Sequence, residues 1–287
     1  MSSWPGKSCI ARTTGLDFSM IKAAVLGKPV THSLSPLVHG QIYEKLGLEY
    51  SYQRLEHDQF TAVEFIQQAL ATEEWSGFSL TMPLKEVAFS LNLACDSFSV
   101  AAHSVNTITK GRGYNTDVSG LVRVLSELER EFESVAIIGS GATARSVMVA
   151  LEAIKTQGKG IGKLEVFRRS SHGDALLRSA SQLEVTFLEI ENLKPDGSQQ
   201  LIISTIPSAA QSSISRQLQG FEGTLLDITY SPWPSTLAGV IKGKVVSGLS
   251  LLVAQAVDQA ALFTGLDFDR EKMFQEIKVS TAREVSL

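Results

Sequence analysis

The sequence predicts an α/β fold of two domains, and three observations support this. From Ile21 onward, short apolar segments alternate with amphipathic ones, which is the order expected around a largely parallel sheet. A glycine-rich turn at residues 139–145 lies between an apolar run and a helical pattern. The chain has 287 residues, of which 44% are hydrophobic, and this length is enough for two domains of ordinary size.

The elements follow from this alternation. Strands are expected at residues 22–26, 50–55, 77–81, 135–138, 164–167, 201–204, 224–227 and 245–247, and helices at 36–46, 61–71, 119–131, 142–154 and 249–264. Residues 1–20 precede the regular pattern, and we expect them to form a disordered extension. The remaining chain divides into an N-terminal domain at 21–117, a second domain at 118–247, and C-terminal helices at 248–287 that pack back on the first domain.

Charge and composition restrict the partners of this chain. The net charge of −4 gives no reason to expect nucleic acid or an anionic membrane, so we expect a small-molecule substrate. Two cysteines and five histidines show no spacing typical of a disulfide framework or a metal site, and no metal is expected. No apolar stretch approaches the roughly 20 residues that span a bilayer, and the N-terminus lacks the apolar core of a secretory signal. We expect a cytoplasmic monomer or homodimer.

The glycine turn is the first chemical motif. Gly139 permits a tight turn, Gly141 lets backbone N–H groups approach a pyrophosphate, and the small Ala144 permits close packing of helix on strand. The residues expected to contact a dinucleotide here are Gly139, Ser140, Gly141, Ala142, Thr143 and Ala144. Glycine turns also join strands to helices in folds that bind nothing, so the motif needs support from its context.

The end of the next strand indicates which dinucleotide is bound. In this fold an acidic residue there binds a free ribose hydroxyl, and an arginine accommodates a 2′-phosphate. The strand at 164–167 continues into Arg168, Arg169 and Ser170, whose guanidinium and hydroxyl groups suit a phosphate. Glu165 is the acidic residue that could instead bind a ribose hydroxyl, but it lies within the strand and not at its end. NADP is therefore favoured over NAD, with solvated loop arginines as the alternative.

Two serines stand before the first predicted helix. Ser33 and Ser35 beside a helix N-terminus can hold a carboxylate. The simpler interpretation is that Ser35 is the N-cap residue of the helix and that Pro36 occupies its first turn.

Lys85 and Asp117 carry the charges of greatest interest. Lys85 follows Pro83 and is expected in the first turn of a new helix, where the helix dipole opposes a cation. Such a lysine suits proton transfer near neutral pH, and an ordinary solvated lysine is the alternative. Asp117 comes just before the domain boundary, ahead of the next helix, and is expected to face the cleft between the domains.

Together these segments resemble the shikimate dehydrogenase family, in order from about Lys22 to the C-terminal region. The matching motifs are Ser33-Leu34-Ser35-Pro36, residues 77–85, Asn106-Thr107, Asn115-Thr116-Asp117, residues 139–145, Arg168-Arg169-Ser170, residues 227–232, and Gly248 followed by a helix with Gln255 and Gln259. Three positions depart from the family pattern: Ser79 replaces asparagine, Arg168 replaces asparagine in the phosphate clamp, and the turn at 141–143 has fewer glycines.

The resemblance implies an NADP-dependent enzyme that interconverts 3-dehydroshikimate and shikimate. It implies Lys85 and Asp117 as the catalytic pair, and a substrate site formed by Ser33, Ser35, Thr81, Asn106, Gln255 and Tyr230. Gly248 is implied near the nicotinamide and Thr205 in a loop that borders the cofactor, although a strand-ending turn explains Thr205 equally well. The alternatives are a related dehydrogenase that acts on quinate or an aminated analogue, and a non-catalytic NADP-sensing regulator.

Overall fold

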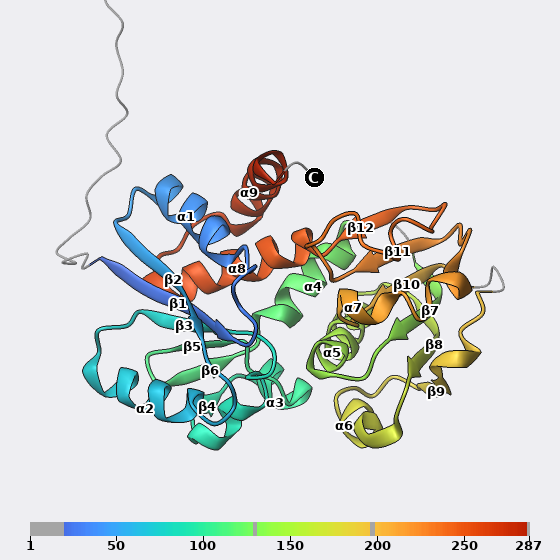
Figure 1. Cartoon of the computed structure of the whole chain (residues 1–287), viewed down its shortest axis with the longest axis horizontal. Helices are drawn as coiled ribbons and strands as arrows, with labels where there is room; N and C mark the ends of the chain where they lie inside the picture. The colour runs from blue at the N-terminus through green and yellow to red at the C-terminus, as the bar shows by residue number, and fades with distance from the viewer. Residues whose placement is uncertain (1–19, 129–130, 196–198, 286–287) are drawn as a thin grey trace, which may run out of the picture.

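The structure of this chain is a computed structural model that describes residues 20–128, 131–195 and 199–285, and its strands form two sheets side by side (Figure 1). All but Met20 of the expected N-terminal extension lies outside the described residues. The two α/β layers confirm the predicted fold class, because helices cover sheets that are largely parallel.

The first sheet has the strand order β2-β1-β3-β5-β6-β4. Its strands are β1 (Ile21–Gly27), β2 (Tyr50–Glu56), β3 (Gly77–Leu80), β4 (Ala94–Cys95), β5 (Thr107–Thr109) and β6 (Arg112–Tyr114). The first three pair in parallel, whereas β5 runs antiparallel to both β3 and β6. The turn between β5 and β6 has positive φ at Lys110 and Gly111, the backbone that a tight hairpin requires.

Helices cover this sheet on both faces. They are α1 (Ser35–Leu46), α2 (Ala62–Thr72), α3 (Ser97–Ala102) and the 3-10 segment η1 (Val87–Leu91). Alternate strand residues, including Ala24, Leu26 and Phe78, form one buried cluster with Ile66 of α2. The opposite face packs against α1 and the later helix α8.

The second sheet is parallel throughout, in the order β12-β11-β10-β7-β8-β9. Its strands are β7 (Phe132–Ile138), β8 (Ile161–Arg168), β9 (Thr186–Glu189), β10 (Leu201–Ser204), β11 (Thr224–Asp227) and β12 (Val245–Ser247), with α5 (Ala142–Thr156), α6 (Asp174–Ser179), α7 (Ser208–Gln211), η2 (Ser171–Gly173), η3 (Ile190–Asn192) and η4 (Ser215–Leu218) between them. From β7 the chain continues through β8 to β9 at one edge of the sheet, and from β10 it continues through β11 to β12 at the other edge. Dinucleotide-binding sheets place their ligand crevice at this point of reversal.

Three further helices complete the fold: α4 (Thr116–Ser126), α8 (Leu249–Thr264) and α9 (Arg270–Glu284). Figure 1 shows α4 and α8 between the sheets, with α9 beside α1. The helix α8 is buried around most of its circumference because it packs against both α4 and α1. A Cβ at Gly120 of α4 would lie 3.1 Å from the backbone nitrogen of Gln255, so a small residue is needed where these helices cross.

Helix starts differ from the sequence expectation at Ser35 and Asn115. Ser35 is the first residue of α1 rather than its N-cap, and its backbone N–H donates to the Ser33 hydroxyl at 3.2 Å. Asn115 caps α4 by accepting the Val118 N–H at 3.1 Å. The helix expected at 119–131 therefore begins at residue 116 and ends at 126, and Asp117 lies inside its first turn.

The expected α-helix around Lys85 is also wrong. Residues 82–86 form turns, and the following helical segment is η1, which begins at Val87. The carbonyl of Lys85 accepts the N–H of Val105 at 2.8 Å. That backbone group is therefore bonded to a distant segment instead of to the next turn of a helix.

Candidate active site

Lys85 and Asp117 meet at the border between the two sheets. The Lys85 Nζ donates to Asp117 Oδ2 at 2.5 Å, and the side chains are 15% and 7% exposed. Lys85 comes from the loop after β3, and Asp117 from the first turn of α4, where the positive end of the helix dipole favours a carboxylate. The structure thus joins the two groups that the family resemblance pairs, and their catalytic role stays a prediction.

Asn106 orients the second oxygen of Asp117. Its Nδ2 donates to Asp117 Oδ1 at 2.9 Å, and its Oδ1 accepts the Thr116 N–H at 2.8 Å. The Asp117 carboxylate is therefore held through both oxygens, with Oδ2 facing the ammonium of Lys85. Asn106 itself is only 2% exposed. Gln255, which is implied as a substrate ligand, lies behind it, with its Oε1 3.5 Å from Asn106 Nδ2.

A second layer of polar side chains supports Asn106 from α8. Gln259 is fully buried, and its Nε2 donates to the Asn106 carbonyl at 3.2 Å and to Thr107 Oγ1 at 2.9 Å. Its Oε1 accepts from Ser79 Oγ at 2.7 Å and lies 3.1 Å from His39 Nε2. All four hydrogen-bonding positions of this amide are used, which locks α8 against β3 and β5.

The network fixes the tautomer of His39. Because Gln259 Oε1 can only accept, His39 Nε2 carries the proton, and Nδ1 accepts from the Tyr43 hydroxyl at 3.0 Å. Burial lowers the pKa of His39 from 6.5 to about 3, so the ring is neutral. Its ring stacks on Tyr52 at 4.1 Å between centroids, and the Tyr52 hydroxyl donates to Ser79 at 2.6 Å.

The sequence interpretation assigned no role to His39, Tyr52 or the side chain of Gln259. The available signal was the position of Gln259, one helical turn after Gln255, which places both on the same side of α8. Nothing in the sequence pairs His39 with Gln259, because 220 positions separate them.

Tyr230 links the second half of the molecule to Ser33. It follows β11, and burial raises the pKa of its hydroxyl, while the neighbouring Ser33 side chain and Leu34 backbone partly oppose this rise. Ser33 also donates to Ser35 Oγ at 3.1 Å. Thr81 follows β3, with its N–H bonded to Leu26 at 2.9 Å. Of the implied substrate residues, Ser33 and Ser35 from the first half therefore lie beside Tyr230 from the second half.

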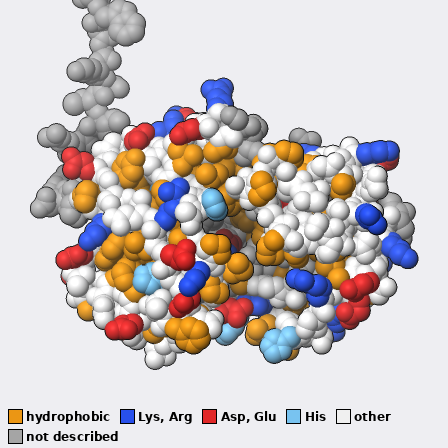
Figure 2. All heavy atoms as spheres, in the orientation of Figure 1, with side chains coloured by type: hydrophobic (Ala, Val, Ile, Leu, Met, Phe, Trp, Pro, Cys, Tyr) orange, Lys and Arg blue, Asp and Glu red, His pale blue; other side chains and the backbone are white. Residues whose placement is uncertain are grey.

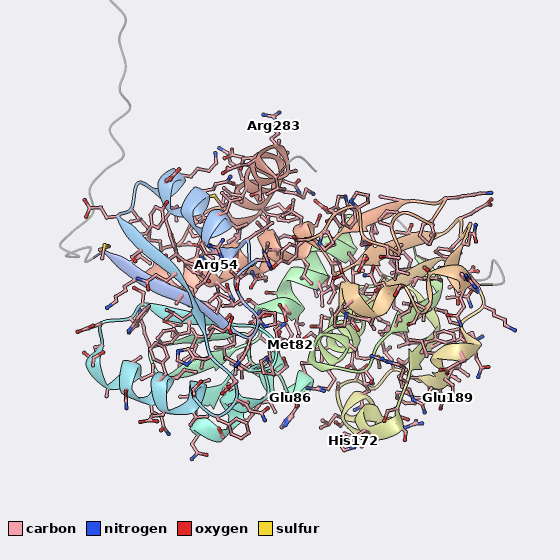
Figure 3. The ribbon with its side chains drawn as sticks, in the orientation of Figure 1. Arg54, Met82, Glu86, His172, Glu189 and Arg283 are labelled. Carbon is pink, nitrogen blue, oxygen red and sulfur yellow. The ribbon has the colours of Figure 1, made fainter. Side chains whose placement is uncertain are left out.

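Arg145 provides a second link between the halves. This buried residue of α5 donates from Nε to the Ala102 carbonyl at 2.7 Å and from Nη2 to the His103 carbonyl at 3.1 Å and to Glu86 at 2.5 Å. Figure 3 labels Met82 and Glu86 at this border. Figure 2 shows that the surface is hollowed between the two halves. The glycine turn is thereby held close to the segment that carries Lys85.

The glycine turn lies at the reversal point of the second sheet. Gly139 has φ +110°, and a Cβ there would lie 2.5 Å from Thr205 Oγ1, so the fold itself requires this glycine. Thr205 donates to the Ile138 carbonyl at 2.8 Å and so ties the end of β10 to that of β7. Gly141 differs, because a Cβ there would meet nothing within 4 Å. Its small size leaves open space before the N-terminus of α5, which fits a bound pyrophosphate.

The two arginines after β8 have different surroundings. Arg168 is buried, and its guanidinium is held by Asp174 at 3.0 Å and by Glu189, which raises its pKa. Arg169 is exposed, and it has no hydrogen-bonding or ion-pair partner among the described residues. Ser170 Oγ accepts the His172 N–H at 3.3 Å. Of the expected clamp, Arg169 is the cation that remains available to a phosphate.

Gly248 lies where β12 ends and α8 begins. A Cβ at this position would lie 1.9 Å from the Ile228 carbonyl oxygen, and the Gly248 N–H donates to the Thr229 carbonyl at 3.2 Å. Close backbone contact therefore requires glycine here, and a role beside a nicotinamide stays a prediction.

Within residues 20–128, 131–195 and 199–285, no group of three or more His, Cys, Asp or Glu side chains is arranged to hold a metal ion. In the same ranges no helix has the length and apolar character needed to cross a membrane.

Comparisons with known proteins agree with this geometry. A family model described as the shikimate dehydrogenase substrate binding domain matches residues 25–108. The shikimate dehydrogenase (NADP(+)) of Xanthomonas euvesicatoria is 30% identical over 284 residues, which cover 92% of this chain and 97% of that protein. Shikimate dehydrogenase of Mycobacterium tuberculosis superposes with a TM-score of 0.76 at 29% identity, over 91% of this chain and 99% of that one.

A further solved structure was determined with ligands. Shikimate 5-dehydrogenase of Thermus thermophilus, in complex with NADP(H) and shikimate, superposes with a TM-score of 0.70 at 25% identity. The match covers 91% of this chain and 100% of that one.

Proposed function

Because this chain belongs to the shikimate dehydrogenase family, we propose that it catalyses the reversible NADPH-dependent reduction of 3-dehydroshikimate to shikimate. The observation that carries the proposal is the ion pair of Lys85 and Asp117 at 2.5 Å, beside the border that Tyr230 and Arg145 span. A regulator that only senses NADP has no need of this pair.

The two halves have separate tasks in this proposal. Residues 21–117 bind the substrate, residues 118–247 bind NADP, and residues 248–287 pack back on the first domain through α8 and α9. We further propose a cytoplasmic enzyme, active as a monomer or homodimer on a small-molecule substrate.

NADPH, when bound, supplies the hydride. The residues that would hold it are Gly139, Ser140, Gly141, Ala142, Thr143, Ala144, Thr205, Gly248 and the Arg168-Arg169-Ser170 segment. The open space at Gly141 supports this assignment because it is not required by packing within the protein. Arg169 is proposed to bind the 2′-phosphate, whereas Arg168 stabilises the loop through Asp174.

Lys85 is proposed to stabilise the reacting oxygen. Reduction of a ketone leaves negative charge on the carbonyl oxygen, and a nearby ammonium neutralises it by donating a proton. Asp117 keeps that ammonium in place through Oδ2, while Asn106 keeps Asp117 in place through Oδ1. In the reverse direction the same nitrogen accepts the proton of the substrate hydroxyl. Ser33, Ser35, Thr81, Gln255 and Tyr230 are proposed to orient the substrate.

The test is an activity grid on the purified full chain, read by reduced-nicotinamide absorbance. Shikimate and quinate are each supplied with NADP and with NAD. We expect the highest kcat/KM with shikimate and NADP. Preferential turnover of quinate with NAD would replace this proposal with quinate dehydrogenation. Tight NADP binding without turnover of either substrate would favour a sensor.

A further inference from the structure

Arg54 of β2 lies on the face of the first sheet that carries the proposed substrate residues. Alternate residues of a strand share a face, so Arg54 projects on the same side as Tyr52, whose hydroxyl donates to Ser79. The strand register aligns Arg54 with Val25 and Val25 with Ser79 across three neighbouring strands. Arg54 is therefore level with Ser79, close to the carboxyl ends of the parallel strands. Figure 3 shows it near α1.

The guanidinium of Arg54 is held next to Ser33. Its Nε donates to the Ser33 carbonyl at 2.8 Å. Its positive charge also acts on Tyr230, where it lowers the pKa of the phenol against the larger effect of burial. The bond from Nε leaves the two terminal nitrogens of the guanidinium as further donors.

This end of the site has a positive charge without a matching carboxylate. In the described parts of the chain, no Asp or Glu forms an ion pair with Arg54, and the first turn of α1 contains no acidic residue. The neighbouring groups are the hydroxyls of Ser33, Ser35 and Tyr230 and the N-terminus of α1. Ser33 donates its proton to Ser35, so Ser35, Tyr230 and the helix N-terminus are the groups that can donate to an anion. A substrate carboxylate would complete this set.

We propose that Arg54 determines specificity for an anionic substrate by binding its carboxylate alongside Ser33, Ser35 and Tyr230. The inference rests on the proposed function, because it concerns the acid group of shikimate. The guanidinium, held beside Ser33 by its Nε, adds a full positive charge to this group of hydroxyls. Serine and tyrosine hydroxyls alone would discriminate less between an acid and its uncharged ester.

The experiment compares shikimate with its methyl ester, which has the same ring but no negative charge. Kinetics with NADP are measured for the unaltered enzyme, Arg54→Gln, Arg54→Lys and the control Arg112→Gln, which changes an exposed arginine in β6. Calorimetric binding of shikimate to each protein with NADP present provides a readout that does not depend on turnover.

We expect Arg54→Gln to raise the KM and Kd for shikimate by about tenfold, with kcat nearly unchanged and with the ester unaffected. Arg54→Lys is expected to be intermediate because it keeps the charge but loses the planar fork. Added salt is expected to raise the KM of the unaltered enzyme more than that of Arg54→Gln. Arg112→Gln is expected to match the unaltered enzyme.

Two results would overturn the inference. Equal losses with acid and ester would assign Arg54 to positioning the Ser33 loop, and an unchanged KM and Kd for shikimate would remove it from the site. Neither result affects the proposed function as long as the unaltered enzyme turns over shikimate with NADP. If the unaltered enzyme does not do so, the proposed function fails, and the calorimetric comparison still tests Arg54.

Discussion

Ser79 donates its hydroxyl proton to Gln259 at 2.7 Å, from β3 to the buried face of α8. Its oxygen in turn accepts the proton of the Tyr52 hydroxyl at 2.6 Å. At the position where the family pattern has asparagine, the short hydroxyl of Ser79 thus connects Tyr52 to Gln259. Ser79 therefore stabilises the Gln259 side chain that supports Asn106, and the only proton of the Ser79 hydroxyl is used within the protein.

His39 makes stability depend on pH in a defined window. The folded protein keeps His39 neutral down to its pKa of about 3, whereas the unfolded chain protonates it near 6.5. The unfolded state therefore binds more protons between these values, and the free energy of unfolding falls as the pH is lowered through them, by up to about 1.4 kcal/mol per unit. Above the unfolded pKa this contribution is constant.

The measurement is urea unfolding of the unaltered protein, His39→Gln and the exposed control His172→Gln between pH 7 and about 5, where carboxylates contribute little. His39→Gln is expected to flatten the slope, and His172→Gln to leave it unchanged. The same slope in all three proteins would show that His39 is not held neutral by the fold.

A substitution at Gly141 is expected to affect cofactor binding without affecting stability. Gly141→Ala is expected to keep the free energy of unfolding within about 0.5 kcal/mol, because its φ of −84° is accessible to alanine and the Cβ meets no protein atom within 4 Å. NADP affinity is expected to fall by about tenfold as the methyl group fills the space before α5. Titration of NADP by calorimetry measures the loss.

Gly139→Ala is the matched comparison, since its positive φ and the contact with Thr205 predict destabilisation of the fold. Unaltered NADP affinity in a stable Gly141→Ala protein would place the pyrophosphate elsewhere.

Arg169 and Arg168 are predicted to differ as cofactor residues. Arg169→Ala is expected to weaken NADP by about ten- to a hundredfold and to leave NAD almost unchanged, because NAD lacks the 2′-phosphate. Arg168→Ala removes the partner of Asp174 and Glu189, so it is expected to lower stability and to affect both dinucleotides alike. Dissociation constants for NADP and NAD, together with thermal unfolding, distinguish the two. Similar effects of Arg169→Ala on both cofactors would remove the phosphate contact.

Much of the second sheet could be predicted from the sequence, because each strand is an apolar run next to a turn or a helical pattern. The strands β4, β5 and β6 could not, since they are short and lack a β-branched apolar pair such as Val245-Val246, which marks the equally short β12. C-terminal helices were expected in residues 248–287, but the bounds of α9 could not be predicted because it buries only Met273, Phe274, Ile277 and Thr281, and its other residues are largely polar.

The candidate site could be predicted less completely than the second sheet. Lys85 and Asp117 were paired through the family motifs, and no property of the sequence alone brings positions 32 residues apart within 2.5 Å. The network of His39, Ser79 and Gln259 could not be predicted, because a buried polar residue looks the same in sequence as an exposed one. Its existence depends on α8 crossing behind β3 and β5, which is a tertiary arrangement.

The most direct test of the central claim is the effect of Lys85→Ala on turnover and on NADP affinity, measured side by side. We expect a loss of about 10²- to 10⁴-fold in kcat for shikimate oxidation, with the Kd for NADP nearly unchanged. Lys28→Ala, which alters an exposed lysine paired with Asp58, is the control and is expected to keep full activity. Retained turnover in Lys85→Ala, or a loss of NADP affinity as large as the loss of turnover, would show that Lys85 does not act at the reacting oxygen.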